Sequence, residues 1–510
     1  MALRESTIKQ EPIKGMRDSL SVPASRLNKA FLMENVYPSD PETGAAVVGR
    51  PGFTQMGAQL GAGGAGQRVF QFTQLDGTER TVGFVGGLMY TYDWGADSWS
   101  QVTLVGVSLP ASGEIFCATY NDKLIVNPND GTNRPFSWDG TTFVSLTDAP
   151  LAFGRIAVYY AKLFFINWAD RSEFMWSEEA SETTGYDQGG FNNAWSLQQT
   201  DQEPLFALYG TNEALYYFRA RSTGAVSGPV STEFIAAGTR EGVSETIGTT
   251  SPGSVFSFDN EIYFIDADGK PRILSRIVSD EHWQDLETAI SAQDKTKFSL
   301  AQGVAHTDLG LALLGIVDSG SIPNKIYALN LRTQEVVAKF SGFPFNALDV
   351  VKNADKVPTL VHLSNDGYAY RHGNPSGSLW DDGLNAGSAS IAHTFIGPPL
   401  GANRATRDGG AIRDEMIFDQ MDLIFQPDTA MTSVAVNYIT PRGTSSAQTI
   451  TVAIATDTAT PNIEEHKSLG LNGRGRWLMP KIVHDQAAER FGLISATVQA
   501  FDDEDDPDIP

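Results

Sequence analysis

The residues best suited to chemistry in this chain are its seven histidines and its single cysteine. No histidine lies at a recognisable metal-ligand spacing from another histidine or from the cysteine. His362 and His372 stand on either side of a predicted hairpin, where we expect solvated or internally bonded side chains. Cys117 lies in the apolar stretch Ile115–Ala118, so we expect a buried small side chain rather than a nucleophile.

Two glycine- or asparagine-rich loops resemble ligand-binding motifs, but each lacks a decisive residue. Asn127–Gly131 suggests a calcium loop, yet it has no glutamate to close an EF-hand, which favours a plain turn. Gly57–Gly66 has no Lys-Ser/Thr ending and no strand–turn–helix context, so we expect a flexible surface loop rather than a phosphate-binding loop. The sequence has no Gly-x-Ser-x-Gly elbow either. We therefore predict no catalytic, cofactor-binding or metal-binding residues, and no enzymatic activity.

The elements that would position any site are short hairpins that recur along the chain. The clearest is Tyr120–Asn127, where one strand ends, Asn121-Asp122 form a turn and an apolar strand follows. Asn, Asp and Gly tolerate the positive φ of such turns, and the residues that follow suit a half-buried strand. Six similar stretches are Gly86–Tyr90, Ala161–Phe165, Asn212–Tyr217, Asp259–Phe264, Asn324–Tyr327 and Asn365–Tyr370. Seven hairpins at intervals of roughly 35 to 65 residues predict an all-β chain with a β-propeller of about seven blades.

Large aromatic side chains close to these hairpins are expected to pack between blades, because they bury the most apolar area per residue. They are Tyr92, Trp94, Trp99, Trp138 and Phe143. One segment, Ser279–Ile290, is strongly helical in pattern instead. Ser279 suits an N-cap, and Trp283, Leu286 and Ile290 share one helical face. We expect a helical insertion near residues 279–297.

The chain divides into four predicted regions. Residues 1–47 predict an extended N-terminal arm, with a short helix within Pro23–Met33, and residues 48–387 predict the propeller. Residues 388–500 predict a small C-terminal β-rich, sandwich-like domain, and residues 501–510 an acidic, solvated tail. The strands expected in the C-terminal domain are Ile417–Phe425, Val434–Tyr438, Ile450–Ile454 and Phe491–Val498.

Composition limits the classes of partner. The chain has 510 residues and a formal charge of −24, from 61 acidic and 37 basic residues. Gripping nucleic acid needs cationic side chains against the phosphates, so DNA binding is a poor interpretation. An acidic surface would instead let DNA pass without holding it. No stretch approaches the ~20 apolar residues of a membrane helix, and the N-terminus lacks the apolar core of a signal peptide.

A carbohydrate-binding or glycoside-hydrolysing propeller is the alternative function. Hydrolysis needs two carboxylates on one bond, and sequence cannot show whether two of them converge. Asp139-Gly140 and Asp366-Gly367-Tyr368 faintly resemble the Asp-box turns of sialidases. In Ser364–Gly367, however, the glycine comes one position too early for the Ser-x-Asp-x-Gly-x-x-Trp pattern.

The order of features resembles the propeller-type tail nozzle, or tail hub, proteins that form the tail tube of short-tailed bacteriophages. The resemblance covers most of the chain. It begins with the arm and the turn that follows it and continues into the hairpins and the C-terminal region. The stretches that carry it are Lys29–Val36, Gly44–Phe53, Tyr120–Leu124, Trp138–Gly140, Met175–Ser177, Gly473–Trp477 and Phe491–Val498.

This resemblance implies a structural protein of the virion tail, assembled in the cytoplasm of a bacterial host. Six copies would form a nozzle or hub ring below the dodecameric portal adaptor, with fibres or spikes attached to its side or to the adaptor. The ring would close the channel that holds the genomic DNA and then conduct that DNA without sequence-specific binding. The loops after Gly57 and around Gly224–Ser254 are candidates for contacts with the lumen or gate. The family offers no catalytic residues and no cofactor.

Overall fold

The computed structural model describes residues 5–9, 15–16, 29–30, 32–38, 47–50, 52–184, 194–196, 203–228, 239–276, 295–318, 320–331, 336–373, 381–384, 387–396, 416–425, 433–440, 443–445, 448–451, 465–475, 478–485 and 492–502. The chain forms two compact units. Unit 1 comprises Met1–Thr54, Tyr327–Gly342 and Gly373–Pro510, and unit 2 comprises Gln55–Ile326 and Phe343–His372. Both chain ends therefore belong to unit 1, and unit 2 is inserted between them in sequence.

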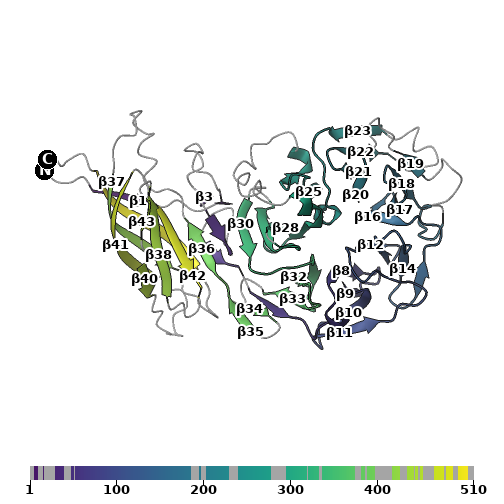
Figure 1. Cartoon of the computed structure of the whole chain (residues 1–510), viewed down its shortest axis with the longest axis horizontal. Helices are drawn as coiled ribbons and strands as arrows, with labels where there is room; N and C mark the ends of the chain where they lie inside the picture. Colours follow the sequence, from purple (N-terminus) through teal and green to yellow (C-terminus); the bar gives the residue numbers. More distant parts are fainter. Residues whose placement is uncertain are drawn as a thin grey trace. The chain divides into compact units, whose positions relative to one another are not determined.

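Unit 2 consists of consecutive antiparallel sheets in which neighbouring strands follow one another along the chain (Figure 1). The first two sheets are β8 (Gly66–Thr73), β9 (Glu79–Val85), β10 (Leu88–Asp93), β11 (Ser98–Val102), and β12 (Phe116–Tyr120), β13 (Lys123–Asn127), β14 (Phe136–Trp138), β15 (Phe143–Ser145). The next two are β16 (Ala152–Tyr159), β17 (Lys162–Asn167), β18 (Glu173–Trp176), β19 (Ala194–Ser196), and β20 (Leu205–Gly210), β21 (Ala214–Arg219), β22 (Thr223–Ser227), β23 (Thr239–Ser244). The remaining strands of the unit are β24 (Phe256–Phe258), β25 (Glu261–Ile265), β26 (Pro271–Ile273), then β27 (Gln302–His306) with β28 (Leu311–Ile316), and β31 (Ala347–Lys352), β32 (Pro358–Leu363), β33 (Ala369–His372).

The first strands of these sheets contact one another in a cyclic order. β8 contacts β12, β12 contacts β16, and β16 contacts β20, which contacts the 3-10 helix η3 (Pro252–Ser254) directly before β24. β24 and η3 contact β27, β27 contacts β31, and β31 returns to β8. Consecutive antiparallel sheets whose first strands surround one axis are the architecture of a β-propeller. The prediction of an all-β chain built from small antiparallel sheets is confirmed, and the order of the sheet contacts is that of a β-propeller.

The predicted hairpin turns use positive φ angles. Asn121 and Asp122 have φ of 47° and 61°, and Asp259 and Asn260 have 49° and 64°. Gly86 and Gly87 behave in the same way. Two central residues with positive φ match the right-handed twist of the flanking strands, so these turns hold the strands in register. The third hairpin achieves this with Tyr160 and Ala161, neither of which is a usual turn residue.

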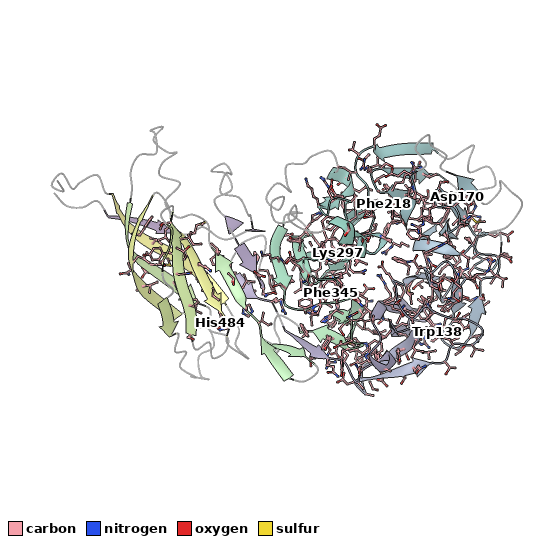
Figure 2. All side chains as sticks on the ribbon, viewed as in Figure 1. Trp138, Asp170, Phe218, Lys297, Phe345 and His484 are labelled. Carbon is pink, nitrogen blue, oxygen red and sulfur yellow. The ribbon has the colours of Figure 1, made fainter. Side chains whose placement is uncertain are left out.

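Aromatic side chains fill the spaces between neighbouring sheets, as predicted. Trp138 of the second sheet packs on Phe72 of the first, with ring centroids 5.9 Å apart, and it stacks on Phe143. Tyr92, Trp94 and Trp99 lie in one cluster with residues of β31, β32 and β33. Phe218 packs edge-on against Phe264 of the following sheet (Figure 2 labels Trp138 and Phe218). The propeller is thus stabilised chiefly by apolar layers between sheets.

Unit 1 contains two larger, largely antiparallel sheets, together with the parallel pair β2 (Gly15–Met16) and β3 (Lys29–Ala30) and the hairpin β34 (Asp381–Leu384) and β35 (Gly387–Ser390). One has the order β41-β37-β43-β6-β5, with β1 also paired to β43, and the other runs from β30 through β4, β36 and β42 to β38, which also pairs with β39 and β40. The strands of the first sheet are β1 (Glu5–Lys9), β5 (Val36–Pro38), β6 (Val47–Gly49), β37 (Met416–Phe425), β41 (Glu465–Gly475) and β43 (Gly492–Asp502). Those of the second are β4 (Leu32–Glu34), β30 (Val336–Ser341), β36 (His393–Ile396), β38 (Ser433–Thr440), β39 (Gly443–Thr444), β40 (Gln448–Thr451) and β42 (Met479–His484). The sheets contact each other through β5 and β36 and through β38 and β41. Both sheets include strands from outside residues 388–500, namely β1, β5 and β6 in the first and β4 and β30 in the second.

Hydrogen bonds of the Asn35 and Arg50 side chains join the N-terminal segment to other strands of unit 1. Asn35 has φ of 57°, and its Oδ1 accepts hydrogen bonds from Arg50 Nε at 2.9 Å and from the backbone N of Ser341 at 2.8 Å. Its Nδ2 donates to the carbonyl of Ala392 at 2.9 Å. Arg50 is 2% exposed and also donates to the carbonyl of Ser341. The segment predicted as an arm is therefore paired at several points within the unit.

The structure corrects two predictions in the N-terminal region. The helix expected within Pro23–Met33 is wrong where residues are described, since Lys29–Ala30 is strand β3 and Leu32–Glu34 is β4. Backbone pairing of β4 with β36 outweighs the local helical pattern. Gly57–Gly66 is not a loose surface loop, because Leu60 is buried and its N–H donates to the carbonyl of Gly367. A Cβ on Gly64 would lie 2.7 Å from the Cα of Gly86, so the glycine permits close backbone packing.

Other predictions fall partly outside the described residues. Most of the helical insertion predicted near 279–297 lies outside the described residues, and the described part contains the 3-10 helix η7 (Lys295–Leu300). The tail is described only as far as Asp502, which ends β43. Gly224–Ser254 is expected as a loop. Its described residues include all of β22 except Thr223, together with β23 and η3. Among the described residues, no helix has the length and apolarity to span a membrane.

Candidate functional site

The first strands of the propeller carry charged and polar side chains toward its centre. Arg68 lies in β8, Arg155 in β16 and Asp349 in β31, while Glu114 precedes β12 and Gln302 begins β27. We call these five residues the axial cluster. Arg68 and Arg155 both act to lower the pKa of Glu114 and the pKa of Asp349, so the four charged members form one electrostatic group.

An ion pair joins the first and last sheets at this cluster. Arg68 Nη2 lies 3.7 Å from Asp349 Oδ2, and the two side chains are 9% and 19% exposed. Burial raises the pKa of Asp349, and the positive charge of Arg68 opposes part of that increase. Removing either partner would leave an uncompensated, largely buried charge where β31 meets β8.

Arg155 completes the cationic part of the cluster. Its guanidinium carbon lies 5.1 Å from the centroid of the Tyr209 ring, within the range of a cation–π contact. Burial lowers the pKa of Arg155, while Asp349 and Glu114 favour its charged form. Two guanidinium groups therefore face two carboxyl groups in a small volume, and their charges largely balance.

Glu114 is the most perturbed acid in the cluster. Its side chain accepts a hydrogen bond from Gln302 Nε2 at 2.8 Å, and its backbone carbonyl accepts one from Asn129 Nδ2 at 3.2 Å. Gly253 leaves room for this carboxylate, because a Cβ there would lie 2.2 Å from Glu114 Oε1. Burial raises the pKa of Glu114 to about 7, although Arg68, Gln302 and Arg155 all act to lower it. Glu114 consequently changes charge near neutral pH.

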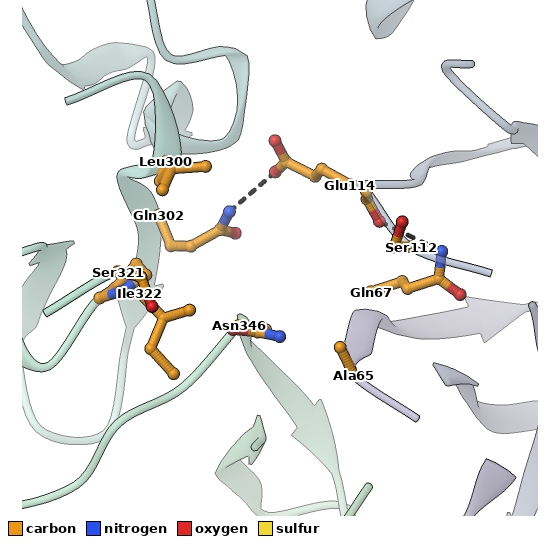
Figure 3. Close-up of a pocket in the computed structure, with 12 residues that line it drawn as sticks. Ala65, Gln67, Ser112, Glu114, Leu300, Gln302, Ser321, Ile322 and Asn346 are labelled. Carbon is orange, nitrogen blue, oxygen red and sulfur yellow. Dashed lines mark hydrogen bonds between the residues drawn. The ribbon is translucent and has the colours of Figure 1, made fainter. Parts of the chain in front are cut away.

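A cavity of about 230 Å³ lies against Glu114 and Gln302 (Figure 3). Its polar lining includes Gln67, whose amide bonds the carbonyls of Pro110 and Gly113 and the N–H of Gly87. Gln302 differs: it is 3% exposed and donates to Glu114, but its Oε1 has no hydrogen-bond partner among the described residues. In Figure 3 this oxygen faces the space enclosed by the labelled side chains. The remaining lining is largely small or apolar, including Leu300, Ile322 and Pro323.

Cys117, His362 and His372 make contacts within the protein. Cys117 is buried in β12, and burial raises the pKa of its thiol to about 12, which leaves it protonated and unreactive at neutral pH. His362 Nδ1 lies 2.9 Å from His372 Nε2, and the His362 ring stacks on Tyr370. Within the described residues, no group of three His, Cys, Asp or Glu side chains is arranged to hold a metal ion.

The acidic turns that resembled Asp boxes or a calcium loop form ordinary local hydrogen bonds. Asp139 Oδ1 accepts from the N–H groups of Thr141 and Thr142, and the bond from Thr142 lowers the pKa of Asp139 most. Asp366 accepts from the hydroxyl of Ser364. Asp130 likewise caps the turn at Thr132. These contacts are those of Asx and related turns, which need no ligand.

Asn127 and Asn129 have a role that the sequence did not indicate. Asn127 Nδ2 donates to the carbonyl of Gly154 at 2.8 Å, and Asn129 Oδ1 accepts from the N–H of Gly154 at the same distance. The two asparagines thereby join the second sheet to the start of the third, beside Glu114. None of the axial cluster was predicted as a site. The available signal was a charged or amide residue in, or next to, the otherwise apolar first strand of several blades.

Comparison with known proteins identifies no family. No family model matches the chain, and no curated protein matches it. Among solved structures, the N-terminal domain of Nup159 is similar at 12% identity and a TM-score of 0.37, covering 67% of this chain and 98% of that one. The Neurospora crassa Pan2 WD40 domain is similar at 9% identity and a TM-score of 0.36, covering 63% and 96%. The assignment of unit 2 as a propeller rests on its own sheet order and strand contacts.

Proposed function

We propose that this chain is a non-enzymatic structural component of a short bacteriophage tail. Six copies form a nozzle or hub ring below the portal adaptor, carry or adjoin fibres or spikes, and surround the channel through which the genomic DNA leaves. The assignment to a phage tail rests on the sequence resemblance. The net charge of −24 supports a DNA conduit, because an acidic wall repels the phosphates rather than binding them.

The observation that best supports ring formation is the edge of the first sheet in unit 1. Strand β41 is 11 residues long, and among the described strands it pairs only with β37 (Figure 1). An edge strand of this length presents a row of backbone N–H and C=O groups to which another strand can bind. If this edge meets a different surface of the next copy, the contact is head-to-tail and generates a ring when the rotation closes.

Electron microscopy of the purified protein and of its native particle tests the proposal. We expect a six-fold ring with a central channel, coaxial with the portal in the particle. Isolated single propellers in every preparation would contradict it. Turnover of glycans by the monomer would favour the alternative of a glycan-processing propeller.

Two single proline variants at neighbouring positions of β41 test the role of the edge. Along an antiparallel edge strand, successive N–H groups face alternately the paired strand and the outside. Of Lys467→Pro and Ser468→Pro, one therefore removes a backbone hydrogen bond to β37 and destabilises the sheet, whereas the other removes an outward-facing backbone donor. Ser468→Pro also removes the hydrogen bond from the Ser468 hydroxyl to Asp422 of β37. We expect the variant whose lost N–H faces outward to fold but not to form rings. Normal rings from both folded variants would exclude this edge as the interface.

A further inference from the structure

We propose that the cavity beside the axial cluster binds a single neutral sugar ring, with Gln302 and Glu114 accepting hydrogen bonds from two of its hydroxyl groups. This inference does not depend on the proposed function, because it concerns only unit 2. It assigns a binding site to residues that no sequence motif marked.

Gln302 has an unsatisfied hydrogen-bond acceptor. This side chain is almost fully buried and lines the cavity, and its buried Oε1 has no hydrogen-bond partner among the described residues. A buried polar atom left in this state costs about 1–3 kcal/mol, so native structures normally provide a donor. The amide nitrogen is already directed to Glu114, and in Figure 3 the oxygen faces the space between the labelled side chains, so a ligand in the cavity can supply the donor.

Gln302 and Glu114 present two acceptors that lie next to each other. The Gln302–Glu114 bond of 2.8 Å places the free amide oxygen and the carboxylate next to each other at one side of the cavity. A ligand that satisfies both needs two donors at a similarly short separation. Vicinal hydroxyl groups on one ring meet this requirement, and each hydroxyl also has lone pairs for donors elsewhere in the site.

The charged groups around the cavity favour a neutral ligand. Arg68 and Arg155 both influence Glu114 electrostatically, so a cationic ligand would be placed near two guanidinium groups. An anionic ligand would meet the Glu114 carboxylate directly. The two arginines are opposed by Asp349 and, when it is ionised, by Glu114. A neutral ligand therefore changes the electrostatic energy of the site least when it enters.

The size and the lining of the cavity suit a single sugar ring. Pockets for drug-sized ligands have volumes of roughly 300–1,000 Å³, so a cavity of about 230 Å³ suits one ring rather than an extended oligosaccharide. Leu300, Ile322 and Pro323 offer apolar surface for the C–H groups of such a ring. The site binds but does not hydrolyse, because glycosidases need two carboxyl groups at one bond, and Asp349 is paired with Arg68 and does not line the cavity.

Saturation-transfer NMR on the full chain is the test. The probes are D-glucose, D-galactose, D-mannose, L-rhamnose and N-acetyl-D-glucosamine, with glucuronic acid and glucosamine as charged analogues. We expect saturation transfer to at least one neutral sugar, and weaker transfer to both charged analogues. A second series with oligosaccharides that end in the responding sugar distinguishes a free monosaccharide from the terminal residue of a surface glycan.

Two variants and one control make the result specific. Gln302→Leu removes the unmet acceptor and should weaken binding at least tenfold. Leu300→Trp fills the cavity from a side chain that is 43% exposed and should abolish binding without disturbing the buried network. Gln59→Leu, a glutamine change outside the cavity in the same unit, should leave binding unchanged. No transfer to any sugar, equal transfer to wild type and Leu300→Trp, or a crystal soaked in sugar that shows only water on Gln302 would overturn the proposal.

Discussion

Replacing Glu114 by glutamine should change how the stability of the protein depends on pH. Burial raises the pKa of Glu114 from 4.5 to about 7 in the folded state. The folded protein therefore holds this proton more tightly than the unfolded chain does. The resulting stabilisation is fully present below pH 4.5 and is lost as the pH rises through 7. The difference between the two pKa values corresponds to about 3 kcal/mol, at about 1.4 kcal/mol for each tenfold change in proton affinity.

Glu114→Gln keeps an acceptor for Gln302 Nε2 but cannot ionise. The free energy of unfolding of the variant relative to wild type should therefore rise by about 3 kcal/mol between pH 4.5 and pH 8. Urea unfolding at a series of pH values measures this difference, and Glu213→Gln, at an exposed turn position in unit 2, serves as the matched control. A difference between Glu114→Gln and wild type that stays constant across this range would refute the assignment of Glu114 as a buried acid. That outcome would leave the sugar-binding test unaffected, because binding is measured separately.

Two further substitutions test the contacts between sheets. Trp138→Ala should lower the free energy of unfolding by about 3–5 kcal/mol, because it removes a 3%-exposed ring that packs on Phe72 and Phe143, whereas Val144→Ala on the exposed side of β15 should change it by less than about 0.5 kcal/mol. Equal losses in urea titrations of the two variants would contradict this packing role. Asn127→Ala should cost about 1–3 kcal/mol by the same measurement, since it leaves the buried carbonyl of Gly154 without its donor. A loss within experimental error would show that the bond contributes nothing to joining the second and third sheets.

The parts of the fold that sequence predicts well are those set by local geometry. Asn121-Asp122 and Asp259-Asn260 were found because a two-residue hairpin demands positive φ and these residue types tolerate it. The failure at Leu32–Glu34 has the opposite cause. That segment has a helical local pattern, but its backbone pairs with β36, which lies far along the chain. Register of this kind depends on partners that no local window contains.

The axial cluster was missed for the same reason. Arg68 and Asp349 lie at opposite ends of the propeller sequence, and each is an ordinary charged residue in its own strand. Their ion pair is visible only in the folded protein, where β31 contacts β8. Glu114 was still less visible, since its pKa depends on burial and on Arg68, Gln302 and Arg155, which lie far from it along the chain. Trp138, by contrast, was predicted correctly, because a large ring in a short strand has few places to pack other than between sheets.

The axial cluster also bears on how the proposed tail ring would conduct DNA. Side chains from non-adjacent sheets meet at the centre of unit 2, where Gln302 of β27 donates a hydrogen bond of 2.8 Å to Glu114, which directly precedes the second sheet. A DNA duplex, whose major groove alone is about 12 Å wide, cannot pass through such a centre. The channel would therefore have to run between copies and not along the axis of each propeller. It follows that Glu114→Gln and Gln302→Leu should leave DNA release unchanged, whereas the proline variant that blocks the outer edge of β41 should abolish it together with the ring. Impaired release in particles that carry either cluster variant but retain intact rings would show that the channel does involve the propeller axis.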